Sequence, residues 1–155
     1  MRIAIGADHG GYPLNERVIE ELRNAGHEIV DFGTHNGSQA DDYPDYAKKV
    51  GEAVQNATAD IGILICGSGV GASVAANKLH GIRAALCGDT YSGHQSREHD
   101  DCNVLCLGAR VIGVELALEI VRAFVAASFS GEERHRRRLA KISEMEKLFS
   151  SSQDR

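Results

Sequence analysis

The chain has 155 residues, of which 43% are apolar and 25% charged, and its net charge is −5 at pH 7 with neutral histidines. This length fits one domain with one core, and the composition is typical of globular rather than disordered or fibrous proteins. The acidic balance argues against a general nucleic-acid binder, and every apolar run is shorter than the roughly 18 residues of a membrane span. Neither nucleic acid nor a membrane is therefore predicted as a partner.

Short apolar runs alternate along the chain with stretches of helical periodicity. The apolar runs predict strands at residues 2–6, 28–31, 61–65, 83–86 and 104–107. Apolar residues at helical spacing predict helices over 14–22 and 46–54, near 72–79, 91–98 and 114–127, and over about 132–149. These elements form one predicted domain over residues 1–149, and the polar end at 150–155 is expected to fray.

The alternation of strands and helices predicts an α/β fold, a Rossmann-like three-layer α/β/α sandwich with a mainly parallel sheet of about five strands. The run 61–65 is apolar throughout, as expected of a parallel strand covered on both faces. Ligands of such sheets bind beyond the carboxyl ends of the strands. No strand follows the last helix, so we expect it to pack on a partner subunit through the apolar stripe Leu139, Ile142, Met145 and Phe149.

A glycine-rich loop, residues 66–71, follows the third predicted strand and precedes a helix. Such a loop exposes backbone N–H groups that favour an anion. A tight turn that needs positive φ is the simpler explanation, but three glycines in five residues exceed what one turn requires. The spacing of Gly67, Gly69 and Ala72, with Asp89 about 20 residues on, also fits a dinucleotide fingerprint. A nucleotide- or phosphate-binding module without turnover therefore stays open, although the loop does not follow the first strand.

Cys66 stands directly before the first glycine of this loop. A cysteine at the end of a buried strand is usually a small hydrophobe, and we interpret Cys87 and Cys106 in this way. At Cys66, the helix dipole and the loop N–H groups favour a thiolate, which can act as a nucleophile or as a general base. The four cysteines, Cys102 included, form no C-x-x-C pair, which predicts free thiols and a cytoplasmic protein.

Two histidines lie next to predicted strands: His9 follows the first strand, and His99 precedes the fifth. We expect both on the same side of the sheet as Cys66. Asp8 is a candidate for orienting an imidazole or for binding a sugar hydroxyl. The cysteines near His99 do not have the spacing of a zinc site, so no metal is predicted.

A basic segment stands out in this acidic chain. Arg134 and Arg138 are four residues apart on one predicted helix face, with His135 beside the first. A solvated helix face is the simpler explanation, but guanidinium groups at this spacing can also clamp a phosphate through forked hydrogen bonds. Together with the glycine loop, the thiol and the histidines, this segment favours a phosphorylated substrate that forms an oxyanion.

Motifs along nearly the whole chain together resemble the type B ribose-5-phosphate isomerases, a family that includes the galactose-6-phosphate isomerase subunits. The resemblance implies a cofactor-free aldose–ketose isomerase of the pentose phosphate pathway, which interconverts ribose 5-phosphate and ribulose 5-phosphate through an enediolate. An isomerase of allose 6-phosphate or galactose 6-phosphate is the alternative within the family. The segments that carry the resemblance are 8–11, 43–47, 66–71, 77–78, 81–84, 99–105, 108–110 and 134–135.

The resemblance implies catalytic roles for matching residues. Cys66 matches the residue that moves the proton between C2 and C1, and His99 matches the histidine that opens the furanose ring. One branch of the family has a glutamate just after the glycine loop, where this chain has Ala72, so the chain resembles the cysteine-base type. The groups that match the enediolate-binding loop are Ser68 and the N–H groups of Gly67, Gly69 and Gly71.

The resemblance also implies a homodimer or homotetramer with the active site at the subunit interface. His99 and Arg110 are implied to reach that site from a partner subunit. Asp100 stands where an asparagine is common, which places a carboxylate near a dianionic substrate, and Ser68 replaces the commoner threonine. The residues implied to contact sugar hydroxyls are Asp8 and Tyr43, and those at or near the phosphate are His9, Arg110, Arg134, His135 and Arg138.

Overall fold

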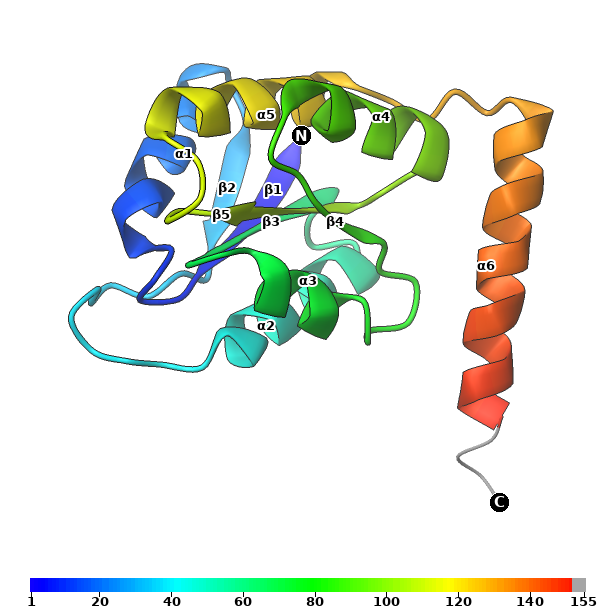
Figure 1. Cartoon of the computed structure of the whole chain (residues 1–155), viewed down its shortest axis with the longest axis horizontal. Coiled ribbons are helices and arrows are strands. Elements are labelled where there is room, and N and C mark those ends of the chain that lie inside the picture. The colour runs from blue at the N-terminus through cyan, green and yellow to red at the C-terminus, as the bar shows by residue number, and fades with distance from the viewer. Residues whose placement is uncertain (152–155) are drawn as a thin grey trace.

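The computed structural model describes the backbone of residues 1–151 and the side chains of residues 1–148. Every predicted strand and helix is present, which confirms the α/β fold class (Figure 1). Of the tail predicted to fray, residues 152–155 lie outside the described residues, and 150–151 belong to the backbone of the last helix. The elements are β1 (Arg2–Ala7), α1 (Tyr12–Asn24), β2 (Glu28–Asp31), α2 (Tyr43–Gln55), β3 (Ile61–Cys66), α3 (Val70–Ala76), β4 (Ala84–Leu86), α4 (Thr90–Asp100), β5 (Val104–Gly108), α5 (Val114–Ala126) and α6 (Glu133–Ser151).

The five strands form one parallel sheet in the order β2-β1-β3-β5-β4. Helices α1, α4 and α5 cover one face, and α2 and α3 cover the other (Figure 1). From β1 the chain passes to β2 on one side and then returns to β3 on the other side of β1. The carboxyl ends of β1 and β3 therefore flank the point where the strand order reverses, and a crevice for a ligand is expected there.

Each face of the sheet has its own apolar layer because alternate residues of a strand point to opposite faces. Ile5 and Ile63 pack with Phe124 of α5, whereas Leu64 packs with Val50 of α2. Gly62 allows α2 to approach closely, since a Cβ there would lie 2.5 Å from the Cγ1 atom of Val50. The central strands are thus held rigidly from both sides.

Helix α6 stands beside the α/β body rather than in either layer (Figure 1). The N–H of Gly81 donates to Oε1 of Glu146 at 2.7 Å, which ties the helix to the loop before β4. Ile142 and Met145 of the predicted stripe are 47% and 60% exposed. Packing of this stripe on a partner subunit stays a prediction. Among the described residues, no helix combines the length and the apolar character needed to cross a membrane.

Phe124 is fully buried, and the guanidinium carbon of Arg97 lies 5.4 Å from the centre of its ring. We expect Phe124→Ala to lower the free energy of unfolding by about 3–5 kcal/mol, because truncation of a buried aromatic ring leaves a cavity. Urea denaturation followed by circular dichroism measures the change. Tyr91→Ala is the control, since Tyr91 is 75% exposed and its truncation is expected to cost little. Equal losses in the two variants would contradict this account of the core.

Candidate active site

A pocket of about 290 Å³ opens where β1 and β3 end. Its walls come from the turn after β1, the start of α2, the glycine loop after β3 and the turn after β5. The larger cavity between α6 and the loop before β4 lies elsewhere in the fold and contains none of the predicted catalytic residues. The residues that line the smaller pocket are Asp8, Tyr43, Cys66, Gly67, Ser68, Gly71, Arg110 and Val111.

The glycines of the loop are needed for two different reasons. Gly69 has φ +80°, a left-handed conformation that favours glycine. At Gly71 the reason is space, because a Cβ there would lie 2.5 Å from the ring of Tyr43. A turn that needs positive φ therefore explains one of the three glycines, and close packing at the pocket wall explains Gly71.

Cys66 is the cysteine that lines the pocket, and its sulfur accepts a hydrogen bond from the N–H of Gly69 at 3.1 Å. Helix α3 has only seven residues, so this direct N–H is the clearer source of stabilisation for a thiolate than the helix dipole. The other three thiols lie in the core and are free, as predicted. Burial raises the pKa of Cys87 to about 11 and that of Cys102 to about 12, and it also raises the pKa of Cys106.

Asp8 and Arg110 bring opposite charges to the same pocket. Asp8 is 6% exposed, and its Oδ1 atom accepts the N–H of Gly11 at 2.9 Å, which orients the carboxylate. The backbone N–H of Arg110 donates to the carbonyl of Gly67 at 2.9 Å. A partner subunit is therefore not required to bring Arg110 to Cys66, contrary to what the family resemblance implied, because the turn after β5 adjoins the loop after β3 in the same chain.

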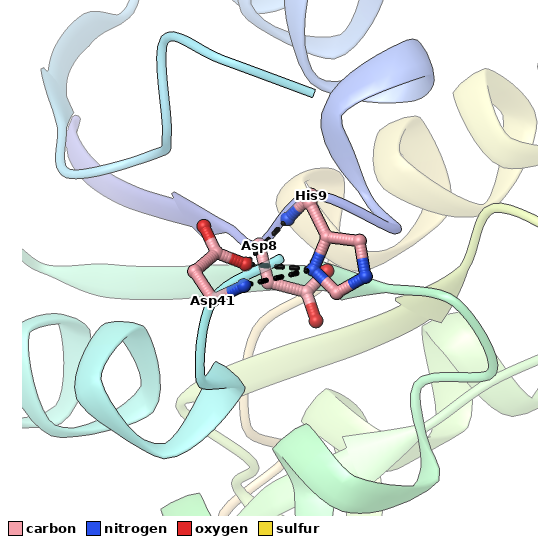
Figure 2. Close-up of side chains that lie close together, drawn as sticks. All are labelled: Asp8, His9 and Asp41. Carbon is pink, nitrogen blue, oxygen red and sulfur yellow. Dashed lines mark hydrogen bonds and ion pairs between the residues drawn. The ribbon is translucent and has the colours of Figure 1, made fainter. Parts of the chain in front are cut away.

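His9 is held by Asp41, a residue that the sequence analysis did not single out (Figure 2). Oδ1 of Asp41 lies 2.8 Å from the backbone nitrogen of His9 and 2.8 Å from its Nδ1 atom. The hydroxyl of Tyr46 donates to Oδ2 of Asp41 at 2.6 Å. Asp41 and His9 are 32 residues apart in the chain, so no local pattern indicates the pair.

One ligand atom each from Asp8, His9 and Asp41 lies within 4.8 Å of the others, which is close enough to hold a metal ion. Hydrogen bonds already engage Nδ1 of His9 and Oδ1 of Asp41 with each other, and Oδ1 of Asp8 with the N–H of Gly11. These hydrogen bonds account for the cluster without a metal ion.

The expectation that His99 lies on the same side of the sheet as His9 and Cys66 is wrong. His9 and Cys66 lie at the carboxyl ends of β1 and β3, whereas His99 lies near the end of α4 and precedes β5. In a parallel sheet that position is at the opposite edge. His99 stacks there on His135, with ring centres 4.2 Å apart and planes 22° apart.

The basic segment belongs to α6 and lies with His99 rather than with Cys66. Burial, followed by the nearby His99, lowers the pKa of His135, which is 2% exposed. Nε of Arg134 donates to Glu132 at 2.9 Å. Arg138 is exposed one turn further along α6, and Asp100 ends α4 beside His99. Within one chain the predicted site residues therefore form two groups, one around Cys66 and one around His99.

Asp89, which completed the dinucleotide fingerprint, has a structural role. Its Oδ1 atom accepts the N–H of Ser92 at 2.7 Å, and its Oδ2 atom accepts the Ser92 hydroxyl at 2.9 Å. These contacts cap the N-terminus of α4. With its carboxylate engaged in this way, Asp89 is less suited to bind the ribose of a nucleotide. These contacts disfavour the hypothesis of a nucleotide-binding module.

A sheet of this topology with a thiol and a glycine loop in its crevice defines a class of small-molecule enzymes rather than one activity. Comparison with known proteins narrows the class. Residues 3–142 match the family described as Ribose/Galactose Isomerase, and the chain belongs to this family. It is 47% identical over 145 residues to ribose-5-phosphate isomerase B of Escherichia coli, covering 94% of this chain and 96% of that protein.

Two solved structures are similar over nearly their whole length. Ribose-5-phosphate isomerase B of Clostridium thermocellum has a TM-score of 0.93 and 50% identity, covering 96% of this chain and 99% of that one. Ribose-5-phosphate isomerase B of Mycoplasma genitalium, solved with bound ribulose-5-phosphate, has a TM-score of 0.88 and 41% identity. That match covers 94% of this chain and 96% of the other.

We expect iodoacetamide at pH 8 to alkylate Cys66 before the other cysteines. Cys66 is 5% exposed, but it lines the pocket, which gives the reagent a route to its sulfur. A thiol with a pKa of about 11, such as that of Cys87, is only about one part in a thousand thiolate at pH 8. Peptide mass spectrometry of the native protein follows labelling at each cysteine. In Cys66→Ser, fast labelling should disappear. Labelling of Cys87 or Cys102 at the rate of Cys66 would contradict the view that Cys66 is the reactive thiol of the pocket.

Proposed function

We propose that this protein is an aldose–ketose isomerase that interconverts ribose 5-phosphate and ribulose 5-phosphate. The single observation that carries the proposal is the Cys66 sulfur, which lines the pocket and accepts the Gly69 N–H at 3.1 Å. Family membership supports the reaction class, and the ribulose-5-phosphate bound to the Mycoplasma genitalium relative supports the substrate. The free cysteines fit a reducing compartment, so we also propose a cytoplasmic location.

The proposed reaction is a proton transfer between two neighbouring carbons. The Cys66 thiolate removes the proton from C2 of the open-chain aldose, and the electron pair moves onto the C1 oxygen to form an enediolate. The hydroxyl proton on O2 passes to the C1 oxygen, which leaves the negative charge on O2. As the C2 carbonyl forms, the Cys66 thiol returns its proton to C1, which gives the ketose and restores the thiolate. Ser68 and the N–H groups of Gly67 and Gly71 stabilise the oxyanion, while the N–H of Gly69 holds the Cys66 sulfur. The Arg110 guanidinium adds positive charge nearby.

We further propose that a second copy of the chain completes the site. His99, which we assign to ring opening, and Arg134 and Arg138, which we assign to phosphate binding, lie apart from Cys66 in their own chain. A symmetric homodimer, alone or within a homotetramer, can bring the His99 group of one subunit to the Cys66 pocket of the other. The exposed apolar residues of α6, such as Met145, support a subunit contact there.

We expect Cys66→Ala to lower kcat about 10²–10⁴-fold while sugar phosphate still binds, because the general base is lost but the rest of the pocket remains. The measurement is isomerisation of ribose 5-phosphate in deuterated water, with NMR detection of deuterium at the exchanging carbon. Hexose 6-phosphates run in parallel test the alternative substrates. In the wild-type protein, deuterium should enter the pentose phosphate at the highest rate.

Isothermal titration of the variant with ribose 5-phosphate is the control for binding. A near-normal kcat in Cys66→Ala would show that Cys66 is not the general base. If the wild-type protein turns over allose 6-phosphate or galactose 6-phosphate but little ribose 5-phosphate, the proposed substrate is wrong. The proposed reaction class would still hold.

We expect an oligomer that contains one Cys66→Ala chain and one His99→Ala chain to regain activity that both parents lack. One of its two sites then has both residues intact, so about half of the wild-type rate is expected for a dimer. The two variants carry different affinity tags, are co-expressed, and are purified through both tags. A mixed oligomer as inactive as its parents, or a monomer by sedimentation, would show that the site is not shared.

A four-carbon aldose phosphate separates ring opening from the other possible roles of His99. Such a sugar cannot close a furanose through its phosphorylated oxygen, so His99→Ala should retain more of its activity with erythrose 4-phosphate than with ribose 5-phosphate. Equal losses with the two substrates would contradict the ring-opening role.

A further inference from the structure

The hydrogen bonds around Asp41 determine which nitrogen of His9 carries a proton. Nδ1 of His9 lies 2.8 Å from Oδ1 of Asp41, a distance that requires a proton between the two atoms. Burial alone would raise the pKa of Asp41, but hydrogen bonds from the Tyr46 hydroxyl and from His9 outweigh it and hold that pKa below its usual range. Asp41 is therefore ionised at neutral pH and can only accept, so Nδ1 of His9 is the donor.

Two further contacts bear on this assignment. The backbone N–H of Asp41 points toward Nδ1 of His9 at 3.4 Å, which by itself would favour Nδ1 as an acceptor. The contact between Nδ1 and the carboxylate is much shorter, at 2.8 Å, and involves a charged group, so it outweighs the backbone contact. The hydrogen bond to Asp41 raises the pKa of Tyr46, which keeps the Tyr46 hydroxyl protonated as the donor to Oδ2. Both oxygens of the carboxylate are thus engaged, and its orientation is set from α2.

The two hydrogen bonds that hold His9 leave one ring nitrogen for a ligand. Oδ1 of Asp41 accepts from the backbone N–H and from the ring of His9, which restrains both the turn after β1 and the side chain. Figure 2 shows the other ring nitrogen, Nε2, on the side of the imidazole that faces away from Asp41. A carboxylate oxygen of Asp8 and one of Asp41 lie within 4.8 Å of a ring nitrogen of His9, and Tyr46 binds Asp41. Asp8 is oriented separately by the N–H of Gly11.

We propose that Asp41, oriented by Tyr46, is a positioning residue that fixes His9 with Nδ1–H toward the carboxylate and presents Nε2 to the phosphorylated substrate. The inference rests on the proposed function and on the family resemblance, which implies that His9 contacts the substrate near its phosphate. Asp41 does not touch the substrate and acts through His9. A carboxylate behind an imidazole sets the tautomer and the ring orientation in the same way in metal sites and in catalytic triads.

The tautomer can be read directly by long-range ¹H–¹⁵N NMR of the histidine rings, with His9→Gln used to assign the signal. We expect the wild-type protein to show Nδ1 of His9 protonated. This measurement does not depend on the reaction, so it tests the arrangement even if the proposed function fails. A neutral His9 protonated at Nε2 would overturn the proposal.

Kinetics test whether the arrangement serves substrate binding. We expect Asp41→Asn to raise KM for ribose 5-phosphate roughly ten- to a hundredfold with little change in kcat, the loss expected for a hydrogen bond to a charged group. Tyr46→Phe should raise KM in the same direction but less, and it keeps the test available if Asp41→Asn folds poorly. Asp45→Asn is the matched control, because it removes the same charge from the exposed first turn of α2.

A double-mutant cycle separates an effect through His9 from a general effect of charge. In a His9→Gln background, Asp41→Asn should change KM no further. The same KM increase in both backgrounds, or an unchanged KM in the single variant, would overturn the proposal. Activity that is lost on chelation and restored by a divalent cation would also overturn it, because Asp8, His9 and Asp41 would then be metal ligands.

Discussion

The hydrogen bond from the Gly69 N–H to the Cys66 sulfur is the contact on which the proposed chemistry depends. Its donor is the N–H of a residue with φ +80°, a left-handed conformation that favours glycine at this point of the loop. The loop is also confined by its neighbours, since a Cβ at Gly108 would lie 2.4 Å from the carbonyl oxygen of Ser68. A donor held in this way is oriented before any substrate arrives, and preorganisation makes such donors effective.

The same close packing ties the turn after β1 to the end of β3. A Cβ at Gly11 would lie 2.0 Å from the carbonyl oxygen of Ile65, so only glycine fits where the turn crosses β3. Asp8, which follows β1, is thereby held in the same pocket as Cys66 at the end of β3. Asp41 then adds a third segment by a hydrogen bond rather than by packing. The pocket is therefore built by backbone proximity first and by side-chain hydrogen bonds second.

The division of the candidate residues into two groups follows from the direction of the chain. Residues that follow parallel strands gather at one edge of the sheet, and His99, which precedes its strand, lies at the other. His99 and His135 are nevertheless ordered by stacking, and burial lowers the pKa of His135. A preformed second group, with exposed apolar residues on α6 such as Ile142 and Met145, fits the proposal of a site shared between two subunits.

The sequence by itself determined the α/β fold and the strand and helix positions, and it singled out Cys66 as a candidate, because periodicity and a glycine loop after a strand are local signals. It also carried the family, through motifs spread along the chain. Only the tertiary structure decided that Arg110 reaches the Cys66 pocket in its own chain, that His99 does not, and that Asp41 holds His9. Those three facts depend on which residues meet across the sheet and across loops, and contacts between distant segments leave no local pattern in the amino-acid order.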